Sequence, residues 1–106
     1  MSVSKLNPNE IKDAMNQLAQ WSVDSQQLSI HKEWRFNNFK TLVNFLNQVC
    51  ALADEQNHHP EILTTYTNIR IRLWTHDCGG ITTKDFKLAQ AIDHLITSNF
   101  SQNISH

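Results

Sequence analysis

Apolar residues recur every three or four positions along three stretches of the chain, a spacing that predicts amphipathic helices. These stretches cover residues 8–19, 39–56 and 83–97. Each helix needs a surface against which its apolar side can be buried. The side chains that we expect on the buried sides are Ile11, Ala14, Met15 and Leu18 in the first helix, Phe39, Leu42, Val43, Leu46, Val49, Cys50 and Ala53 in the second, and Phe86, Ala89, Ile92 and Ile96 in the third.

The ends of these helices carry start and stop signals. Asn7 is a suitable N-cap for the first helix, with Pro8 at its first position. Thr82 and Asp85 match a capping-box pattern at the start of the third helix, with Asp in place of the usual Glu. Proline cannot continue a helix, so the second helix should end before Pro60.

Other stretches alternate apolar and polar residues, which is typical of strands with one buried face. Residues 28–36 form one such strand, in which Lys32 interrupts the apolar side. Residues 62–66 and 69–75 form two more, and Thr67-Asn68 between them predicts a hairpin with a two-residue turn. Amphipathic helices beside such strands predict an α+β fold, a two-layer sandwich.

A chain of 106 residues is long enough for one core, so we expect residues 1–106 to form a single domain. Residues 21–27 hold a short extended piece and a turn, and this segment is a candidate for one more strand. The polar tail after Asn99 should be loose.

The three tryptophans should lie in the core or in an interface; they are Trp21, Trp34 and Trp74.

The composition, with 40% hydrophobic and 18% charged residues, is that of an ordinary soluble protein. Nine Lys and Arg residues balance ten Asp and Glu residues without forming a basic run, so direct nucleic-acid binding is not expected. The longest apolar run, residues 49–53, is too short to span a membrane, and the first residues do not resemble a secretion signal. Cys50 and Cys78 do not form a disulfide framework, so we expect a cytoplasmic protein.

Three histidines and two carboxylates carry the most informative chemistry in the sequence; they are Asp54, His58, His59, His76 and Asp85. If Thr67-Asn68 is the hairpin turn, continuing the ladder places His59 opposite His76, with their Cβ atoms roughly 4.5–5.5 Å apart. The two carboxylates belong to the end of the second helix and the start of the third. All five side chains can therefore converge at one end of the hairpin.

Three interpretations of this group are open. The histidines could be surface or hydrogen-bonded core groups without a function. Three imidazoles with a carboxylate could bind zinc, although adjacent histidines are not a usual ligand spacing. They could also perform general acid–base catalysis without a metal, because imidazole exchanges protons near neutral pH.

Neighbouring residues offer weaker signals. Nothing marks Cys78 as a nucleophile, and Gly79-Gly80 predicts a tight turn and not a phosphate-binding loop. Arg70 and Arg72 could bind an anion, but the solvated face of a strand explains them equally well.

The combined pattern resembles the signature of the pterin-4a-carbinolamine dehydratase family. The matching residues are Asp54, His58-His59-Pro60, Tyr66, His76 and Asp85. Residues 34–39 and 75–82 are also similar to the family's aromatic strand-to-helix junction and to its loop before the last helix. The resemblance extends from about Leu18 to Ile96, and Asp54 stands where members often carry Glu.

This resemblance implies a four-stranded antiparallel sheet with three helices packed on one face, the fourth strand lying near Trp21. It implies dehydration of 4a-hydroxytetrahydropterin to quinonoid dihydropterin and water, a step that recycles the cofactor of aromatic amino-acid hydroxylases. No metal and no other cofactor are implied. The protein would be a homodimer or homotetramer with a small pterin as substrate. In animals, members also act as dimerisation partners of a homeodomain transcription factor, so a non-enzymatic interaction protein is the alternative function.

The resemblance, together with the predicted hairpin, assigns roles to residues. His59 and His76 would transfer protons, and His58 would hold the substrate or polarise its hydroxyl. Asp54 would orient a histidine, and Asp85 would be a supporting residue. The residues expected to bind the pterin are His58, His59, Pro60, Thr75, His76, Asp77 and Cys78.

Overall fold

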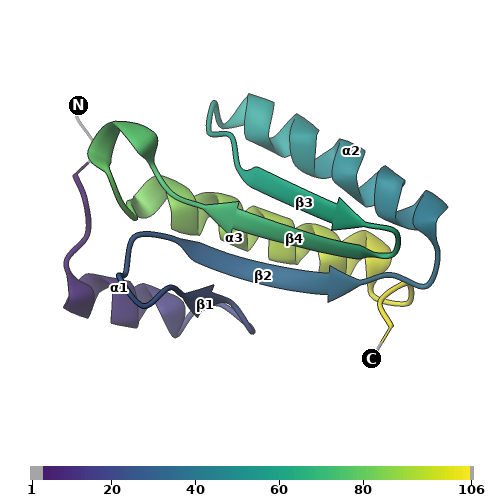
Figure 1. The fold of residues 1–106 in the computed structure, drawn as a ribbon, viewed down its shortest axis with the longest axis horizontal. Coiled ribbons are helices and arrows are strands. Elements are labelled where there is room, and N and C mark those ends of the chain that lie inside the picture. The colour runs from purple at the N-terminus through teal and green to yellow at the C-terminus, as the bar shows by residue number, and fades with distance from the viewer. Residues whose placement is uncertain (1–3, 106) are drawn as a thin grey trace.

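The computed structural model describes residues 4–105. Figure 1 shows one sheet in front, with α3 behind it and α1 and α2 along its two sides. The four strands are antiparallel and lie in the order β1-β2-β4-β3. The elements are α1 (Pro8–Met15), β1 (Ser22–Val23), β2 (Ile30–Arg35), α2 (Phe39–Glu55), β3 (Glu61–Thr65), β4 (Asn68–Leu73), a 3₁₀ turn (His76–Cys78), α3 (Thr83–Leu95) and a π-helical turn (Ile96–Phe100).

The helices cover one face of the sheet. In β4, Ile69, Ile71 and Leu73 are fully buried on that face, whereas Arg70 between them is exposed. Burying an aliphatic side chain of this size contributes about 1.5–3 kcal/mol, so this row anchors the helices to the sheet. The α+β fold is confirmed, as is a short strand next to Trp21, which is itself buried.

The hairpin of β3 and β4 has a different turn from the one expected. Thr65 pairs with Asn68, so Tyr66 and Thr67 form the turn. Tyr66 adopts a φ of 51°, in the left-handed region. The sequence predicts this conformation at Asn68, because Asn tolerates it. The predicted turn at Thr67-Asn68 is therefore wrong by one residue.

The pairing across the hairpin shifts with the turn. Ile62 pairs with Ile71 and not with Leu73, and the ladder ends at the pair of Glu61 and Arg72. A shift of two positions keeps every apolar side chain on the buried face, because side chains alternate with a period of two. The predicted direct pairing of His59 with His76 is wrong, because neither residue belongs to the ladder.

Helix α2 buries Leu42, Val49 and Ala53 as predicted, but the rest of its buried side differs from the expected one. Phe39 is 51% exposed and Cys50 is exposed, although both were predicted to face the core. The missing core residue is Phe45, whose ring centroid lies 5.2–5.5 Å from those of three other buried aromatic side chains. This aromatic cluster sets the rotation of the helix. The buried residues of α2 are Leu42, Phe45, Val49 and Ala53.

The C-terminal tail is packed and not loose. Phe100 is buried, Ile104 forms a bridge with Phe36, and the Ser105 N–H donates to the Arg35 carbonyl at 2.7 Å. Helix α3 itself ends at Leu95, two residues before the predicted end, because the chain continues into the π-helical turn. Helix α1 also ends earlier than predicted, at Met15.

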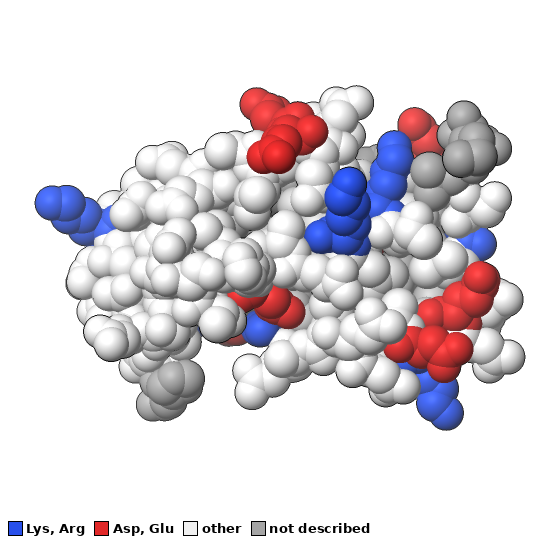
Figure 2. Space-filling model, turned by 180° about the vertical axis from the view of Figure 1, so that it is seen from behind, with Lys and Arg blue, Asp and Glu red and all other residues white. Residues whose placement is uncertain are grey.

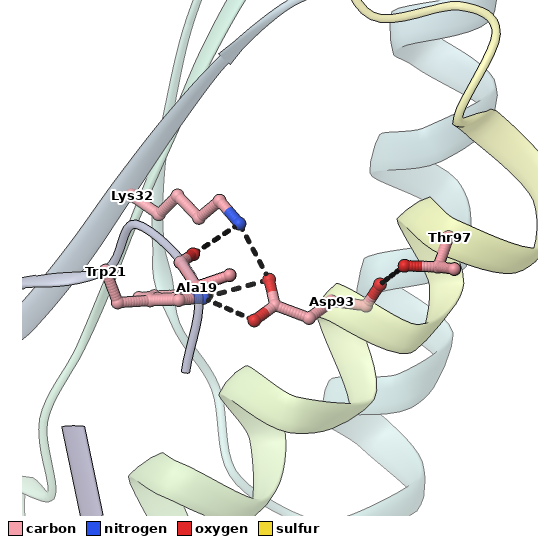
Figure 3. Close-up of polar contacts among 5 residues, drawn as sticks. All are labelled: Ala19, Trp21, Lys32, Asp93 and Thr97. Carbon is pink, nitrogen blue, oxygen red and sulfur yellow. Dashed lines mark hydrogen bonds and ion pairs between the residues drawn. The ribbon is translucent and has the colours of Figure 1, made fainter. Parts of the chain in front are cut away.

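Lys32 interrupts the apolar side of β2 because it has a carboxylate partner there. Asp93 of α3 accepts hydrogen bonds from Lys32 Nζ at 3.0 Å and from Trp21 Nε1 at 2.9 Å (Figure 3). The Lys32 ammonium also donates to the Ala19 carbonyl at 2.8 Å. The side chains of Lys32 and Asp93 are only 10% and 22% exposed. Asp93 therefore joins α3, β2 and the segment after α1.

On the helix side, the described residues form no continuous patch of one charge. Figure 2 shows Lys, Arg, Asp and Glu side chains at scattered positions on that face, separated by uncharged surface. Within residues 4–105, no helix is long and apolar enough to cross a membrane.

Replacing Asp93 with Ala should lower the free energy of unfolding by about 2–4 kcal/mol, because it leaves a mostly buried ammonium without its carboxylate. Urea denaturation followed by circular dichroism measures this change. The control is Asp13→Ala on α1, where the side chain is exposed, and should change stability by less than about 0.5 kcal/mol. Equal effects of the two substitutions would contradict the assigned role of Asp93.

Candidate functional site

A cavity of about 260 Å³ lies where α2 and β4 end and α3 begins. All three candidate histidines line it, so we call it the histidine cavity. Two larger hollows, of about 430 and 600 Å³, lie against α1, and among the described residues no histidine lines either of them. The side chains around the histidine cavity are Asn57, His58, His59, Trp74, Thr75, His76, Asp77 and Lys84.

The end of α2 gives His58 and His59 different environments. Asn57 adopts a φ of 50°, in the left-handed region, and the His58 N–H donates to the Ala53 carbonyl at 2.9 Å. This is a common way to end a helix. The His58 side chain is only 9% exposed, whereas that of His59 is 62% exposed. One ring is therefore held inside the protein, and the other is accessible to solvent.

Asp85 is the buried partner of His58. Its Oδ1 lies 2.5 Å from His58 Nε2, and the Asp85 side chain is fully buried. Because a carboxylate oxygen accepts, Nε2 of His58 carries the proton in this contact. Asp85 Oδ2 accepts from the Thr75 hydroxyl and from the Thr82 N–H, both at 2.9 Å. Asp85 thus completes the predicted capping box of α3 and orients His58 at the same time.

Two threonines complete this buried network. The Thr75 and Thr82 hydroxyl oxygens are 2.7 Å apart, and both residues are buried. Since Thr75 donates to Asp85, the Thr82 hydroxyl donates to Thr75. Among the described residues, every buried side-chain polar atom has a hydrogen-bond partner. A fully satisfied network of this kind resists rearrangement.

Asp54 is the exposed partner of His59. Asp54 Oδ1 lies 3.0 Å from His59 Nε2, and the Asp54 side chain is 84% exposed. The Asp54 side chain is one methylene shorter than that of the Glu that family members often carry at this position, and it still contacts a histidine. An exposed pair of this kind contributes little to stability, but it restricts the rotation of the ring.

His76 is positioned by a tight loop after β4. The Thr75 N–H donates to the Gly80 carbonyl at 2.8 Å, which folds the chain back on itself. Gly79 has a φ of 66°, a conformation that favours glycine, and it ends the 3₁₀ turn that begins at His76. The His76 ring centroid lies 4.7 Å from that of Trp74.

The structure brings most of the expected residues to this cavity. Asp54 and Asp85 are not among the lining residues, but each contacts a different histidine that is. Pro60 and Cys78 are not among the residues that line it. The expected residues that do line it are His58, His59, Thr75, His76 and Asp77.

Three lining residues were missed. Asn57 and Lys84 have no local sequence signal, because they reach the cavity only through the ends of two helices. Trp74 continues the exposed face of β4 that holds Arg70 and Arg72, and this alternation could have placed it outside the core. Trp21 and Trp34 are buried as expected, but Trp74 is only half-buried.

Within residues 4–105, no three His, Cys, Asp or Glu side chains converge in a way that could hold a metal ion. The two carboxylates near the cavity are each within hydrogen-bonding distance of an imidazole. The arrangement provides one fixed and two more accessible imidazoles around a small space, which is suited to proton transfer.

The two histidine–carboxylate pairs should differ in their contribution to stability. Asp85→Asn should lower the free energy of unfolding by about 2–4 kcal/mol, because a buried network loses one acceptor. Asp54→Asn, the matched change in the exposed pair, should alter it by less than about 0.5 kcal/mol. Urea denaturation of both variants measures the difference, and an equal loss in both would refute the assignment of Asp85 as the buried anchor.

A family model and the similar proteins all indicate the same protein family. Residues 4–95 match the family described as pterin 4 alpha carbinolamine dehydratase. A protein of Sulfurisphaera tokodaii, provisionally named a pterin-4-alpha-carbinolamine dehydratase, is 42% identical over 90% of this chain and 100% of its own length. A protein of Prochlorococcus marinus with the same provisional name is 40% identical over 91% of this chain and 99% of its own.

Solved structures show the same fold. A crystal structure described as a transcriptional coactivator/pterin dehydratase from Brucella melitensis superposes with a TM-score of 0.83 at 27% identity. It covers 87% of this chain and 98% of its own. A pterin dehydratase-like protein described as a RuBisCO assembly factor in the alpha-carboxysome has a TM-score of 0.64 at 23% identity, over 76% and 94% of the two chains, and shares the fold. From the extent of the family match and the identity to its members, the chain belongs to the pterin 4 alpha carbinolamine dehydratase family.

Proposed function

We propose that this protein dehydrates 4a-hydroxytetrahydropterin to quinonoid dihydropterin and water by histidine acid–base catalysis. The observation that carries the proposal is the convergence of His58, His59 and His76 on one cavity of about 260 Å³. The relatives' provisional names and the family match support the substrate class. The reaction would recycle the pterin cofactor of aromatic amino-acid hydroxylases.

The reaction needs two proton transfers. The C4a–O bond breaks as a proton is delivered to the leaving hydroxyl, and a ring nitrogen loses a proton, so that water and the quinonoid product form. We assign these transfers to His59 and His76, whose exposed positions allow proton exchange with solvent. His58, held by Asp85, would bind the substrate or polarise its hydroxyl. Asp54 would orient His59 through their 3.0 Å contact.

The cavity supplies more than the three imidazoles. Thr75 and Asp77 contribute polar groups to its wall, and Lys84 contributes a cation. Polar groups around a small cavity fix the orientation of a heterocyclic ligand by hydrogen bonds. Pro60 and Cys78, expected at the pterin, adjoin the lining residues in sequence and would act from behind them.

We also propose that the protein self-associates as a homodimer or homotetramer. Strand β3 is at the edge of the sheet, so one side of its backbone has no neighbouring strand within the described chain. Neither Pro nor Lys interrupts this strand, and Leu63 at its centre is 60% exposed. Beside it, Tyr66 and Phe39 are 75% and 51% exposed and stack on each other at 6.3 Å. An unprotected edge with apolar side chains favours pairing with a second copy.

A non-enzymatic role is the second candidate. It is favoured by the descriptions of the two structural neighbours, a transcriptional coactivator/pterin dehydratase and a RuBisCO assembly factor. The apolar edge at β3 could serve another protein as well as a second copy. The histidine cavity favours the enzyme, because interaction through the edge does not require three imidazoles at the far end of α2.

The histidine roles predict large losses of activity. His59→Ala and His76→Ala should each slow dehydration by about 10²–10⁴-fold with folding intact, because each removes a proton-transferring group. The measurement is the lifetime of the carbinolamine generated by a pterin-dependent hydroxylase, with and without this protein. His94→Ala, an exposed histidine on α3 outside the cavity, is the control and should retain full activity.

Two outcomes of this assay would be decisive against the proposal. Wild-type protein that leaves the carbinolamine lifetime unchanged would exclude the dehydratase and favour the interaction protein. Near-wild-type turnover by both variants would refute the roles of His59 and His76. Zinc in the purified protein, with activity lost to a chelator, would instead support a metal site.

The edge-strand interface predicts a change in oligomeric state. In a symmetrical antiparallel pairing centred on β3, the two Leu63 side chains would lie opposite each other, so Leu63→Lys should introduce repulsion and give monomers. Sedimentation velocity at micromolar concentration measures this. Gln26→Lys adds the same charge at the exposed β1–β2 turn and should leave the oligomer intact. A monomeric wild type, or an oligomeric Leu63→Lys variant, would contradict this interface.

A further inference from the structure

We propose that Trp74, held in place by Arg72, forms the wall on which the flat ring of the substrate stacks, and that this wall positions His76. The identity of the ring as a pterin rests on the proposed function. The contact itself rests on the geometry of three side chains at every second position: Arg72 near the end of β4, then Trp74 and His76 in the segment that follows the strand.

Trp74 differs from the rest of the cavity lining. The other lining side chains are imidazoles, short polar groups and one ammonium, whereas Trp74 contributes an indole ring. It is half-buried and in contact with His76, whose ring centroid is 4.7 Å away at an interplanar angle of 54°. A buried tryptophan would have no surface to offer, and a fully exposed one would have no fixed position. Trp74 has both.

Arg72 holds Trp74 from outside the cavity. The guanidinium carbon of Arg72 lies 4.6 Å from the Trp74 ring centroid, within the range of a cation–π contact. Arg72 is not among the residues that line the cavity. It therefore acts on a bound ring only through Trp74, and we assign it as a positioning residue.

The guanidinium of Arg72 is fixed by further partners. Arg72 Nε donates to Ser29 Oγ at 2.9 Å, and Nη1 lies 3.7 Å from Glu61 Oε1. Ser29 is fully buried, and its hydroxyl donates to Asp24 Oδ2 at 3.2 Å. Because Arg72 is tied both to Ser29, just before β2, and to Glu61 of β3, its guanidinium is held in one position.

Asp24 completes this support as a carboxylate. Burial acts to raise the pKa of Asp24. Hydrogen bonds from the Leu28 and Ser29 backbone and from the Ser29 hydroxyl act in the opposite direction, as does the positive charge of Arg72. Together they outweigh burial and hold the pKa of Asp24 below its usual value. A continuous series of contacts thus runs from Asp24 through Ser29 and Arg72 to Trp74. It starts at the β1–β2 turn and ends at the histidine cavity.

A planar wall suits the proposed reaction. Dehydration converts the tetrahedral C4a carbon into a trigonal one, so the pterin ring becomes flatter as the C4a–O bond breaks. A flat ring makes closer contact with an indole than a puckered ring does, so stacking on Trp74 improves toward the product. An interaction that strengthens along the reaction lowers the barrier. The wall should therefore affect kcat as well as binding.

Calorimetric titration with 7,8-dihydropterin, a stable tautomer of the product, tests the wall without catalysis. Trp74→Leu should weaken binding about ten-fold, because a stacking surface for a heteroaromatic base is lost. Trp74→Phe keeps an aromatic ring and should restore binding to within about three-fold of wild type. Thermal unfolding of each variant checks that the fold is retained.

The role of Arg72 is tested by a double-mutant cycle. Arg72→Gln should weaken 7,8-dihydropterin binding about three-fold, since it removes a partly exposed cation–π contact. The same change made in the Trp74→Leu protein should have no further effect on binding. Arg70→Gln, two residues earlier on the same exposed face of β4, is the matched control and should bind as wild type does.

The outcomes separate this proposal from the dehydratase itself. If wild-type protein neither binds dihydropterin nor shortens the carbinolamine lifetime, the proposed function fails. If wild-type protein does both, but Trp74→Leu retains its affinity and its kcat, only the stacking wall is refuted. Equal losses from Arg72→Gln with and without Trp74 would show that Arg72 does not act through the indole.

Discussion

The hydrogen bond between His58 and Asp85 is the interaction on which the rest of the site depends. Asp85 belongs to the first turn of α3, and His58 to the segment that follows α2, so one contact joins two helices at the end of the sheet. Asp85 is fully buried and receives hydrogen bonds from Thr75 and Thr82 as well. Its position is thus determined by the core, the helix cap and the loop after β4 together. The imidazole that it holds becomes a fixed side of the cavity, around which the more exposed groups are arranged.

The second histidine–carboxylate pair uses the same residue types in another environment. His59 and Asp54 are exposed, so they can exchange protons with solvent and adjust to a substrate. His76 reaches the cavity from the loop after β4 and rests against Trp74, whose other support is Arg72. In the proposed function, the cavity would combine a buried anchor, an exposed group that exchanges protons and an aromatic wall. This combination fits a reaction in which a proton must be delivered and another removed while a small ring stays in one place.

The convergence of the histidines could be predicted from the sequence, but the details of the pairing could not. A hairpin shifted by two residues buries the same apolar side chains, so Ile62 fits opposite Ile71 as well as opposite Leu73. The apolar side of helix α2 is wider than the part that is buried, and the aromatic cluster around Phe45 decides which part faces the core. Lys84 carries no pattern that marks it, because it reaches the cavity only through the position of the helix end. For Trp74, the alternation along β4 indicates the exposed face but not the cavity. The capping box at Asp85 was predictable because it depends on four consecutive residues.

The most direct test of the account is a crystal structure of the protein with bound 7,8-dihydropterin. The account predicts that the ring lies in the histidine cavity, in contact with the imidazoles of His58, His59 and His76 and against the indole of Trp74. A ring bound in one of the hollows beside α1, or histidine side chains turned away from the ligand, would contradict it.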